Sequence, residues 1–344
     1  MNESRDILQY LHYHPLSSRG DITAGTAFKG SDATLKRVIA AGIKAGDIVA
    51  EGKARATRYR LSPQAQLLMP LNLDTYFALE VDERQVHSSY NFELINGLLA
   101  EARLFSDKEL AHLDTLQDEF RQHVNELTDN EYRKEMERLG IDLSWKSSQI
   151  EGNTYTLLET ERLLRESKTA EGKTKEEAVM LLNHKDALSF ILDNPDYLQE
   201  LTVSHIEDIH QLLTKDLSID KGLRRHRVGI TGTNYHPLDN EFQIREAMRD
   251  ACKLINSKYN IFEKALLTLL LLSYIQPFSD GNKRTARITS NALLIANDYC
   301  PLSFRSIDSI EYKKAMLIFY EQNNLYAFKQ IFIEQFEFAV KEYF

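Results

Sequence analysis

The feature that most constrains the fold is an apolar run at residues 265–275, ALLTLLLLSYI. A run of this length is too short to cross a bilayer, which needs about 20 apolar residues. We therefore expect a helix buried on all sides, and such a helix must be surrounded by other elements. Long stretches elsewhere repeat apolar residues at helical spacing, whereas strand-like alternation is scarce. These patterns predict a mainly α-helical protein.

Composition supports a folded, intracellular protein of more than one domain. The 344 residues exceed one ordinary core and suggest two or three domains. Two cysteines, Cys252 and Cys300, provide no disulfide framework and no cysteine-based metal site. The first residues lack the basic-then-apolar pattern of a signal peptide. We expect a cytoplasmic protein without a membrane partner.

Residues 1–70 differ in charge from the rest of the chain. They hold ten Lys or Arg and six Asp or Glu, a net charge of +4, although the whole chain is at −9. Three helix patterns and two short β-like stretches follow one another, which is the order of a winged helix-turn-helix domain. This interpretation predicts DNA contacts from the third helix and from the wing. The candidates are Lys36 and Arg37 on the helix, and Lys53, Arg55 and Arg58 in the wing. The alternative is a small helical module that contacts another protein.

The remaining chain is expected to comprise a connector at residues 71–105 and a helical domain at residues 106–344. Ser106 and Glu109 form a capping box for the first helix of that domain. Further helices are predicted at about 130–149, 156–166, 174–193, 202–215, 241–257, 262–275, 283–298, 308–320 and 327–342. Residues 222–240 interrupt them with Gly, Asn, Pro and β-branched residues, which predicts an inserted β-hairpin.

The apolar run is followed by QPFSDGNKRTAR, residues 276–287, which has the character of an anion site. Pro277 ends one helix, a turn at residues 280–282 follows, and Lys283 begins the next helix. The first amides of a helix have no partner within it and attract anions. Arg284 and Arg287 lie on neighbouring positions of that helix and can grip phosphate oxygens. Asp280 is a suitable ligand for the Mg²⁺ that accompanies nucleotides.

The twelve residues resemble the motif of the Fic family, His-x-Phe-x-(Asp/Glu)-Gly-Asn-(Gly/Lys)-Arg-x-x-Arg. Every defining position matches except the first, which is Gln276. The resemblance covers roughly residues 75–344. It implies a Fic-type helical fold with a β-hairpin flap. It also implies a reaction in which a Ser, Thr or Tyr hydroxyl of a protein attacks ATP and receives AMP.

The resemblance implies a role for each matching residue. Asp280 would hold Mg²⁺, and Phe278 would pack into the core. The nucleotide phosphates would meet Gly281, Asn282, Lys283, Arg284 and Arg287, with Asn291 near the adenosine. The flap, with Thr231, Gly232 and Thr233, would align the target by strand addition. Lys283 also occurs in Doc-type toxins, which transfer a phosphate, but those lack the arginine present here as Arg287.

A second pattern, SSQIEGN, is similar to the inhibitory helix of Fic proteins. Ser147, Glu151 and Gly152 match (Ser/Thr)-x-x-x-Glu-(Gly/Asn). By that resemblance the helix lies near residues 139–152, and its glutamate pairs with Arg287 and prevents a productive ATP pose. The alternative is an ordinary helix end at which Gly152 is the terminator. A dimer is plausible for this subclass.

Gln276 stands where the family has its catalytic base. A neutral amide can hydrogen-bond a hydroxyl but cannot deprotonate it. Three explanations remain open at this point. In the first, the chain is an inactive or weak form, natural or engineered, of a protein adenylyltransferase, and this protein itself is one candidate target. In the second, it is a nucleotide-binding pseudoenzyme that acts as a DNA-binding transcription regulator. In the third, another base replaces the missing histidine, and His236 is the candidate.

Overall fold

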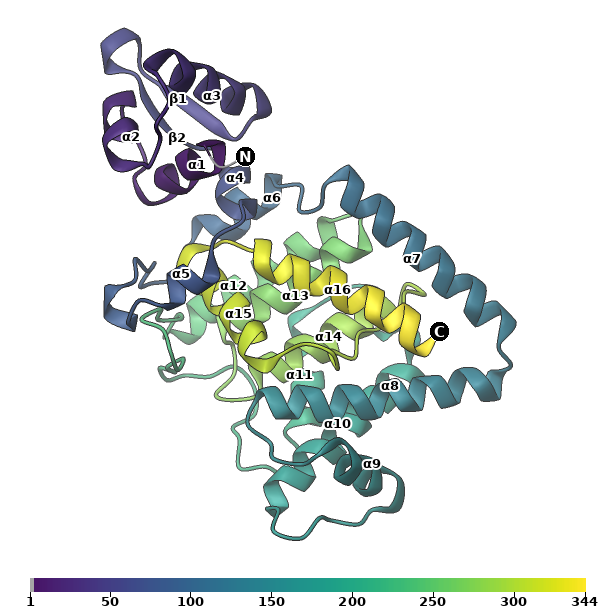
Figure 1. The fold of residues 1–344 in the computed structure, drawn as a ribbon. Helices are drawn as coiled ribbons and strands as arrows, with labels where there is room; N and C mark the ends of the chain where they lie inside the picture. The colour runs from purple at the N-terminus through teal and green to yellow at the C-terminus, as the bar shows by residue number, and fades with distance from the viewer. Residues whose placement is uncertain (1–2) are drawn as a thin grey trace.

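The computed structural model describes residues 3–344, and its N-terminal end forms a separate lobe (Figure 1). The lobe comprises α1 (Glu3–Tyr13), α2 (Arg19–Gly25), α3 (Asp32–Ala45), β1 (Ile48–Glu51), the short 3-10 turn η1 (Ala54–Ala56) and β2 (Arg58–Leu61). The strands pair antiparallel, with Ile48 opposite Leu61. The lobe has its own small core, to which every one of these elements except η1 contributes. Three helices and a two-stranded hairpin are thus present in the expected order.

The segment expected to be a connector carries several short elements and belongs in part to the helical body. These are α4 (Pro63–Leu68), α5 (Leu73–Phe77), η2 (Val81–Glu83), the π-helical turn η3 (Leu94–Leu98) and α6 (Leu99–Glu101). Leu94, Leu99 and Leu104 are fully buried in the main core. Residues from about 90 onward are therefore core residues of the body and not a free linker.

The helical body is built around the apolar run, as its composition requires. It comprises α7 (Asp107–Glu126), α8 (Asp129–Ile150), α9 (Leu157–Glu166), α10 (Lys175–Asp193), η4 (Pro195–Leu198), α11 (Val203–Leu213), α12 (Glu241–Ser257), α13 (Ile261–Ile275), α14 (Asn282–Ile295), α15 (Ser309–Gln322) and α16 (Tyr326–Tyr343). Every residue of α13 from 265 to 275 is buried. Helices α12, α14 and α15 pack against α13, which lies at the centre of the body (Figure 1).

Capping boxes begin four consecutive helices of the body. In each, a Ser or Thr side chain accepts the amide of the residue three positions later, and the Glu at that position accepts the amide of the Ser or Thr. The pairs are Ser106 with Glu109, Thr128 with Glu131, Thr156 with Glu159, and Thr174 with Glu177. These signals explain why the expected helix starts lie within a few residues of those observed.

The prediction of a β-hairpin at residues 222–240 is wrong. Within residues 3–344 the structure has strands only at β1 and β2. Residues 222–240 form an irregular loop with a turn at Thr231 and Gly232, and we call it loop 222–240. Its backbone groups bond to other segments of the chain or to side chains, and among the described residues no backbone–backbone hydrogen bond joins its two halves. The β-branched residues therefore have no cross-strand partner within the loop.

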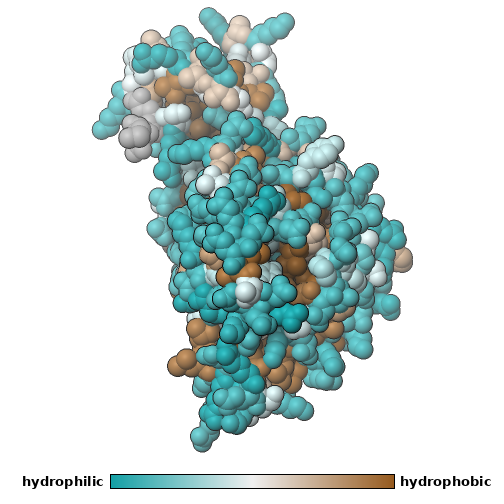
Figure 2. Space-filling view, turned by 90° about the vertical axis from the view of Figure 1, so that its right-hand side faces the viewer, coloured by the Kyte–Doolittle hydropathy of each residue, from teal (hydrophilic) through white to brown (hydrophobic). Residues whose placement is uncertain are grey.

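The outer surface is largely hydrophilic on the face that carries α7 and the α7–α8 turn. Figure 2 shows hydrophobic residues within a hollow at the middle of that face, and further groups of them on the N-terminal lobe and near the lower end of the view. No helix in the described range, 3–344, is both long and apolar enough to cross a membrane. The apolar run of α13 is thus part of a protein core, as its length predicted.

Candidate functional site

The turn between α13 and α14 is held in shape by the amides of two side chains. Gln276 ends α13 in a left-handed conformation, with φ 51° and ψ 60°. Its Nε2 donates to the Ser273 carbonyl at 2.6 Å, and its Oε1 accepts from Asn282 Nδ2 at 3.0 Å. Asn282 also bonds both backbone groups of Phe278, at 2.8 Å each. Gln276 and Asn282 therefore lock the turn, and Gln276 has no basic atom to offer.

Gly281 and the first turn of α14 form a cradle of unpaired donors. Gly281 precedes the helix with φ 80°, a backbone angle that glycine adopts without strain. Among the described residues, the amides of residues 282–284 donate to no protein atom. Arg284 and Arg287 are 1% and 0% exposed, and their guanidinium groups retain buried nitrogens without a partner: Nε and Nη1 of Arg284, and Nη1 of Arg287. Buried donors are nearly always bonded, so these nitrogens without a partner make the turn a candidate site for an anion.

The predicted contact between the second arginine and the end of α8 is present. Arg287 Nε donates to Ser147 Oγ at 2.8 Å, and Nη2 lies 3.1 Å from Glu151 Oε1. The other carboxylate oxygen of Glu151 lies 3.5 Å from Lys283 Nζ. Burial would raise the pKa of Glu151, but Arg287 and Lys283 outweigh it, so the pKa lies below its usual value. Glu151 is therefore a carboxylate that occupies one side of the anion site.

Gly152 also serves as the terminator that the alternative interpretation required. It follows Glu151, the last cap residue of α8, and has φ 99°. A left-handed glycine after a helix end is a common stop signal. The two interpretations of SSQIEGN are thus compatible in one structure.

Two buried histidines that sequence reasoning did not assign to the site lie against it. His210 stacks on the ring of Phe278 with centroids 3.7 Å apart, and its Nε2 donates to the Asp280 carbonyl at 3.0 Å. His184 lies 2.8 Å, by its Nε2, from Ser147 Oγ. Burial lowers the pKa of His210 to about 4 and, with the nearby Arg287, holds the pKa of His184 well below its ordinary value. Both rings are therefore neutral and serve to hold the site; no sequence spacing marks them.

Asp280, the predicted ligand of Mg²⁺, lies exposed in the turn before α14. Its side chain is 68% exposed, Oδ1 accepts the amide of Gly281 at 2.6 Å, and Oδ2 lies 3.6 Å from Arg284 Nη2. No cluster of three or more His, Cys, Asp or Glu that could hold a metal occurs among residues 3–344. A Mg²⁺ at Asp280 would thus need oxygens from a phosphate ligand and water, as is usual for this ion.

Loop 222–240 is anchored beside the motif by Arg224. This buried guanidinium donates from Nε to the Gln276 carbonyl at 2.6 Å and from Nη2 to the Leu238 carbonyl. Midway along the loop, Thr231 and Gly232 form an exposed turn, and Thr233 Oγ1 accepts a hydrogen bond from the amide of Tyr235. His236 is exposed, and its backbone amide bonds to Ser88.

Asn291, the residue expected near the adenosine, is bonded within the protein. Asn291 is fully buried, its Nδ2 donates to the Leu302 carbonyl at 2.9 Å, and its Oδ1 accepts the Leu302 amide at 2.7 Å. In this structure the amide of Asn291 is thus bonded to the backbone of Leu302 and is not exposed; its contact with a nucleotide stays a prediction. The Asn291 side chain fixes the segment after α14.

The basic candidates of the lobe lie on its surface. Those on α3 and those in the turn between the strands are all exposed: Lys36, Arg37, Lys53, Arg55 and Arg58. Lys36 pairs with Asp32 at 2.7 Å, one turn earlier. The other four side chains have no ion pair among the described residues.

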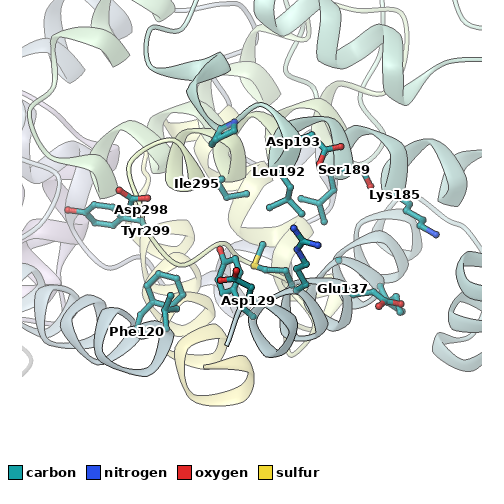
Figure 3. Close-up of a pocket in the computed structure, with 18 of the residues that line it drawn as sticks. Phe120, Asp129, Glu137, Lys185, Ser189, Leu192, Asp193, Ile295, Asp298 and Tyr299 are labelled. Carbon is teal, nitrogen blue, oxygen red and sulfur yellow. The ribbon is translucent and has the colours of Figure 1, made fainter. Parts of the chain in front are cut away.

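A large cavity lies away from the motif. It has a volume of about 1070 Å³ and lies between α7, α8, α10 and the end of α14 (Figure 3). Leu192 and Ile295 lie on one wall and Phe120 on another (Figure 3). No residue of 276–287 lines it. We therefore take the motif turn, and not this cavity, as the candidate site.

Comparisons with known proteins agree with this choice. Residues 200–294 match the model of the Fic/DOC family. A protein adenylyltransferase Fic of Drosophila willistoni is 29% identical over 159 residues, 44% of this chain and 31% of the relative. One from Nematostella vectensis is 25% identical over 295 residues, 79% of this chain and 68% of the relative. The chain thus spans about a third of the Drosophila relative.

Solved structures show the same fold. Fic-1 (residues 134–508) from C. elegans has a TM-score of 0.60 and 21% identity, covering 68% of this chain and 71% of that chain. A Fic family protein from Desulfovibrio desulfuricans has a TM-score of 0.58 and 17% identity, covering 70% and 75%. The family match includes the motif turn, α11 and loop 222–240. Residues 200–294 are therefore similar to the Fic/DOC family, within a chain that has the fold of solved Fic proteins.

Proposed function

We propose that the Fic/DOC domain binds ATP with Mg²⁺ at residues 276–287 and is an autoinhibited protein adenylyltransferase with weak or no activity in its present sequence. The observation that carries the nucleotide site is the set of unpaired donors on Arg284 and Arg287 beside the free amides of α14. Two buried guanidiniums and a helix N-terminus suit a chain of phosphates. The relatives named as adenylyltransferases support ATP as the nucleotide.

The transfer reaction requires a base that the site lacks. A target hydroxyl oxygen would attack the α-phosphorus of ATP, the bond to the β-phosphate would break, and pyrophosphate would leave. The hydroxyl proton must be accepted, and general bases contribute roughly 10²–10⁴-fold to such steps. Gln276 stands at this position with both ends of its amide bonded. Asp280 would hold the Mg²⁺, which would neutralise phosphate charge.

The inhibition would act through Arg287. Its Nη2 and Nε are held by Glu151 and Ser147, so they are not free to bind the terminal phosphate. ATP would then bind in a non-productive pose. Both the missing base and the occupied arginine reduce transfer, and each can be changed separately.

Labelling with two forms of ATP tests the activity. The Gln276→His/Glu151→Gly variant is incubated with Mg²⁺ and ATP labelled at the α- or the γ-phosphate. Protein labelling by the α-label alone is expected, because AMP is transferred. Labelling by the γ-label would instead show phosphate transfer, as in Doc-type toxins. If the variant binds ATP but is not labelled, the proposed activity is refuted. Strong labelling of the protein with the present sequence would show that Gln276 does not disable the transfer.

A second candidate function is a nucleotide-sensing transcription regulator. It is favoured by the exposed basic residues of the lobe, whose helices and hairpin follow the order of a winged-helix domain. In this proposal the lobe binds DNA and nucleotide binding alters that affinity. Binding to DNA from its own promoter region, measured at several salt concentrations with and without ATP, tests it. Absence of binding at low salt would exclude a DNA-binding role.

A further inference from the structure

Residues 79–91, which we call the strap, run along one side of loop 222–240 (Figure 1). Hydrogen bonds join them: Arg84 Nη2 donates to the Gly232 carbonyl at 2.7 Å, and the His236 amide donates to the Ser88 carbonyl at 3.0 Å. Asn234 Nδ2 donates to Asp82 Oδ1 at 2.9 Å and to the Val81 carbonyl at 3.5 Å. A parallel bridge pairs Ser89 with His236. The second half of the loop thus has a backbone partner from a segment about 150 residues earlier.

Arg224, near the start of the loop, donates its amide to the Pro277 carbonyl at 2.9 Å, but within residues 3–344 the stretch that follows has no backbone partner. Among the described residues, the backbone groups of residues 227–231 bond to no protein atom. Gly229 and Thr231 are exposed. An extended peptide adds to a free backbone edge. The strap therefore determines which edge of the loop remains open.

Arg84 of the strap combines a buried ion pair with a hydrogen bond to the loop. Its side chain is 3% exposed and pairs with the fully buried Glu321, with Nη1 and Oε1 3.1 Å apart. The other terminal nitrogen donates to Gly232, so the guanidinium joins α15 to the tip of the loop. Glu321 also accepts from the Tyr76 hydroxyl at 2.5 Å. A rigid, forked donor of this kind can serve two partners in fixed directions.

The same end of α15 contacts the N-terminal lobe. Gln322, next to Glu321, has its Oε1 2.9 Å from His12 Nε2 on α1. The backbone of Glu321 accepts the amide of His87 at 2.8 Å. A cavity of about 330 Å³ lined by His12, His87 and Gln322 lies between lobe and body. The N-terminal lobe thus contacts the end of α15 at which Glu321 pairs with Arg84.

We propose that Arg84 is a positioning residue for loop 222–240. Paired with Glu321, it holds the Gly232 carbonyl, keeps the second half of the loop on the strap and leaves residues 227–231 as the edge for a target. The Gln322–His12 contact places the N-terminal lobe against the same end of α15. The placement of the loop stands on the geometry, whereas its role in target binding rests on the proposed function.

Hydrogen exchange of the full chain, followed by mass spectrometry, tests the positioning. In Arg84→Lys the ammonium can still pair with Glu321 but cannot reach both partners. In Arg84→Met/Glu321→Gln both buried charges are removed together, so neither is left unpaired. Peptides covering residues 231–238 are expected to exchange about tenfold faster in both variants, because the backbone bond of His236 opens more often. The Lys329→Met/Glu109→Gln variant, which removes the buried pair between α16 and α7, is the control.

Unchanged exchange of these peptides in Arg84→Lys, with an unchanged melting temperature, would overturn the proposal. Equal acceleration in the control would also overturn it, since the effect would then be general loosening. ATP binding in a Glu151→Gly background is measured in parallel and is expected to be unaffected by Arg84→Lys. Failure of ATP to bind at all would refute the proposed function, while the exchange result would still decide the role of Arg84.

Discussion

Replacing Glu151 with glutamine separates nucleotide binding from catalysis, because it changes the anion site without touching Gln276. The carboxylate lies 3.1 Å from Arg287 and 3.5 Å from Lys283 and is 23% exposed. Glutamine keeps the shape of the side chain but removes its negative charge from the side of the site where phosphates would bind. The affinity for ATP with Mg²⁺ is therefore expected to rise in Glu151→Gln.

The size of the effect follows from the contact that is weakened. A hydrogen bond to a charged group contributes about 1.5–3 kcal/mol. Glutamine retains a neutral bond to Arg287, so we expect roughly the lower part of this range to be gained by ATP. At about 1.4 kcal/mol for each factor of ten, the dissociation constant should fall about tenfold. In Glu151→Gly, which leaves no side chain, the fall should approach about a hundredfold.

Isothermal titration with ATP and Mg²⁺ measures this directly. Glu135→Gln is the matched control, since Glu135 lies on the same helix and pairs with Arg138 at 2.8 Å, away from the motif. Its affinity for ATP should equal that of the unmodified chain. Equal or weaker ATP binding in Glu151→Gln, with a normal control, would refute the reasoning that Glu151 competes with phosphate for Arg287.

Three further predictions concern stability and the lobe. The pKa of His210 is about 4 in the folded chain, against an ordinary value of 6.5. Between these pH values the unfolded chain binds more protons than the folded chain. The free energy of unfolding is therefore expected to fall by at most about 3 kcal/mol as the pH drops from 6.5 to 4. His210→Gln should flatten that part of a pH series of denaturant titrations; an unaltered slope would argue against it. Gly281→Ala should lower the unfolding free energy by about 1–2 kcal/mol through its φ of 80° alone, because the added carbon meets no atom closer than 3.5 Å, and thermal melting checks this. Lys53→Ala and Arg58→Ala should each reduce the slope of log affinity for DNA against log salt concentration by about 0.9 in magnitude. An unchanged slope would show that these residues do not contact phosphates.

The helices and the motif turn could be predicted because their signals are local. A helix was expected at residues 174–193, and α10 spans Lys175–Asp193, since its capping box lies within four residues of sequence. The turn at Gly281 and the free amides after it follow from the same kind of local rule. The contact of Glu151 with Arg287 could be predicted because the two sequence patterns that contain these residues both resemble patterns of one family.

The remaining features depend on contacts that no local pattern records. Loop 222–240 has the composition of a hairpin, but its hydrogen-bond partners lie on the strap. Asn291 lies in a region where a nucleotide contact was expected, yet the backbone of Leu302 uses its whole amide. His210 and Arg84 were missed because their partners are 70 and 148 residues away in sequence. Such pairings require the tertiary structure.

The position of Glu151 at the very end of α8 has a consequence for how the site could open. The helix ends at Ile150, Glu151 is its cap, and a Cβ added to the left-handed Gly152 that follows would meet no atom. A change of the Glu151 side-chain rotamer would move the carboxylate away from Arg287, while the last turn of α8, with the buried Ser147 and Ile150, stays packed. The free energy needed is that of a local opening and not of unfolding. Release of the arginine can therefore be fast and reversible, and mutations that tune it need not alter the stability of the domain.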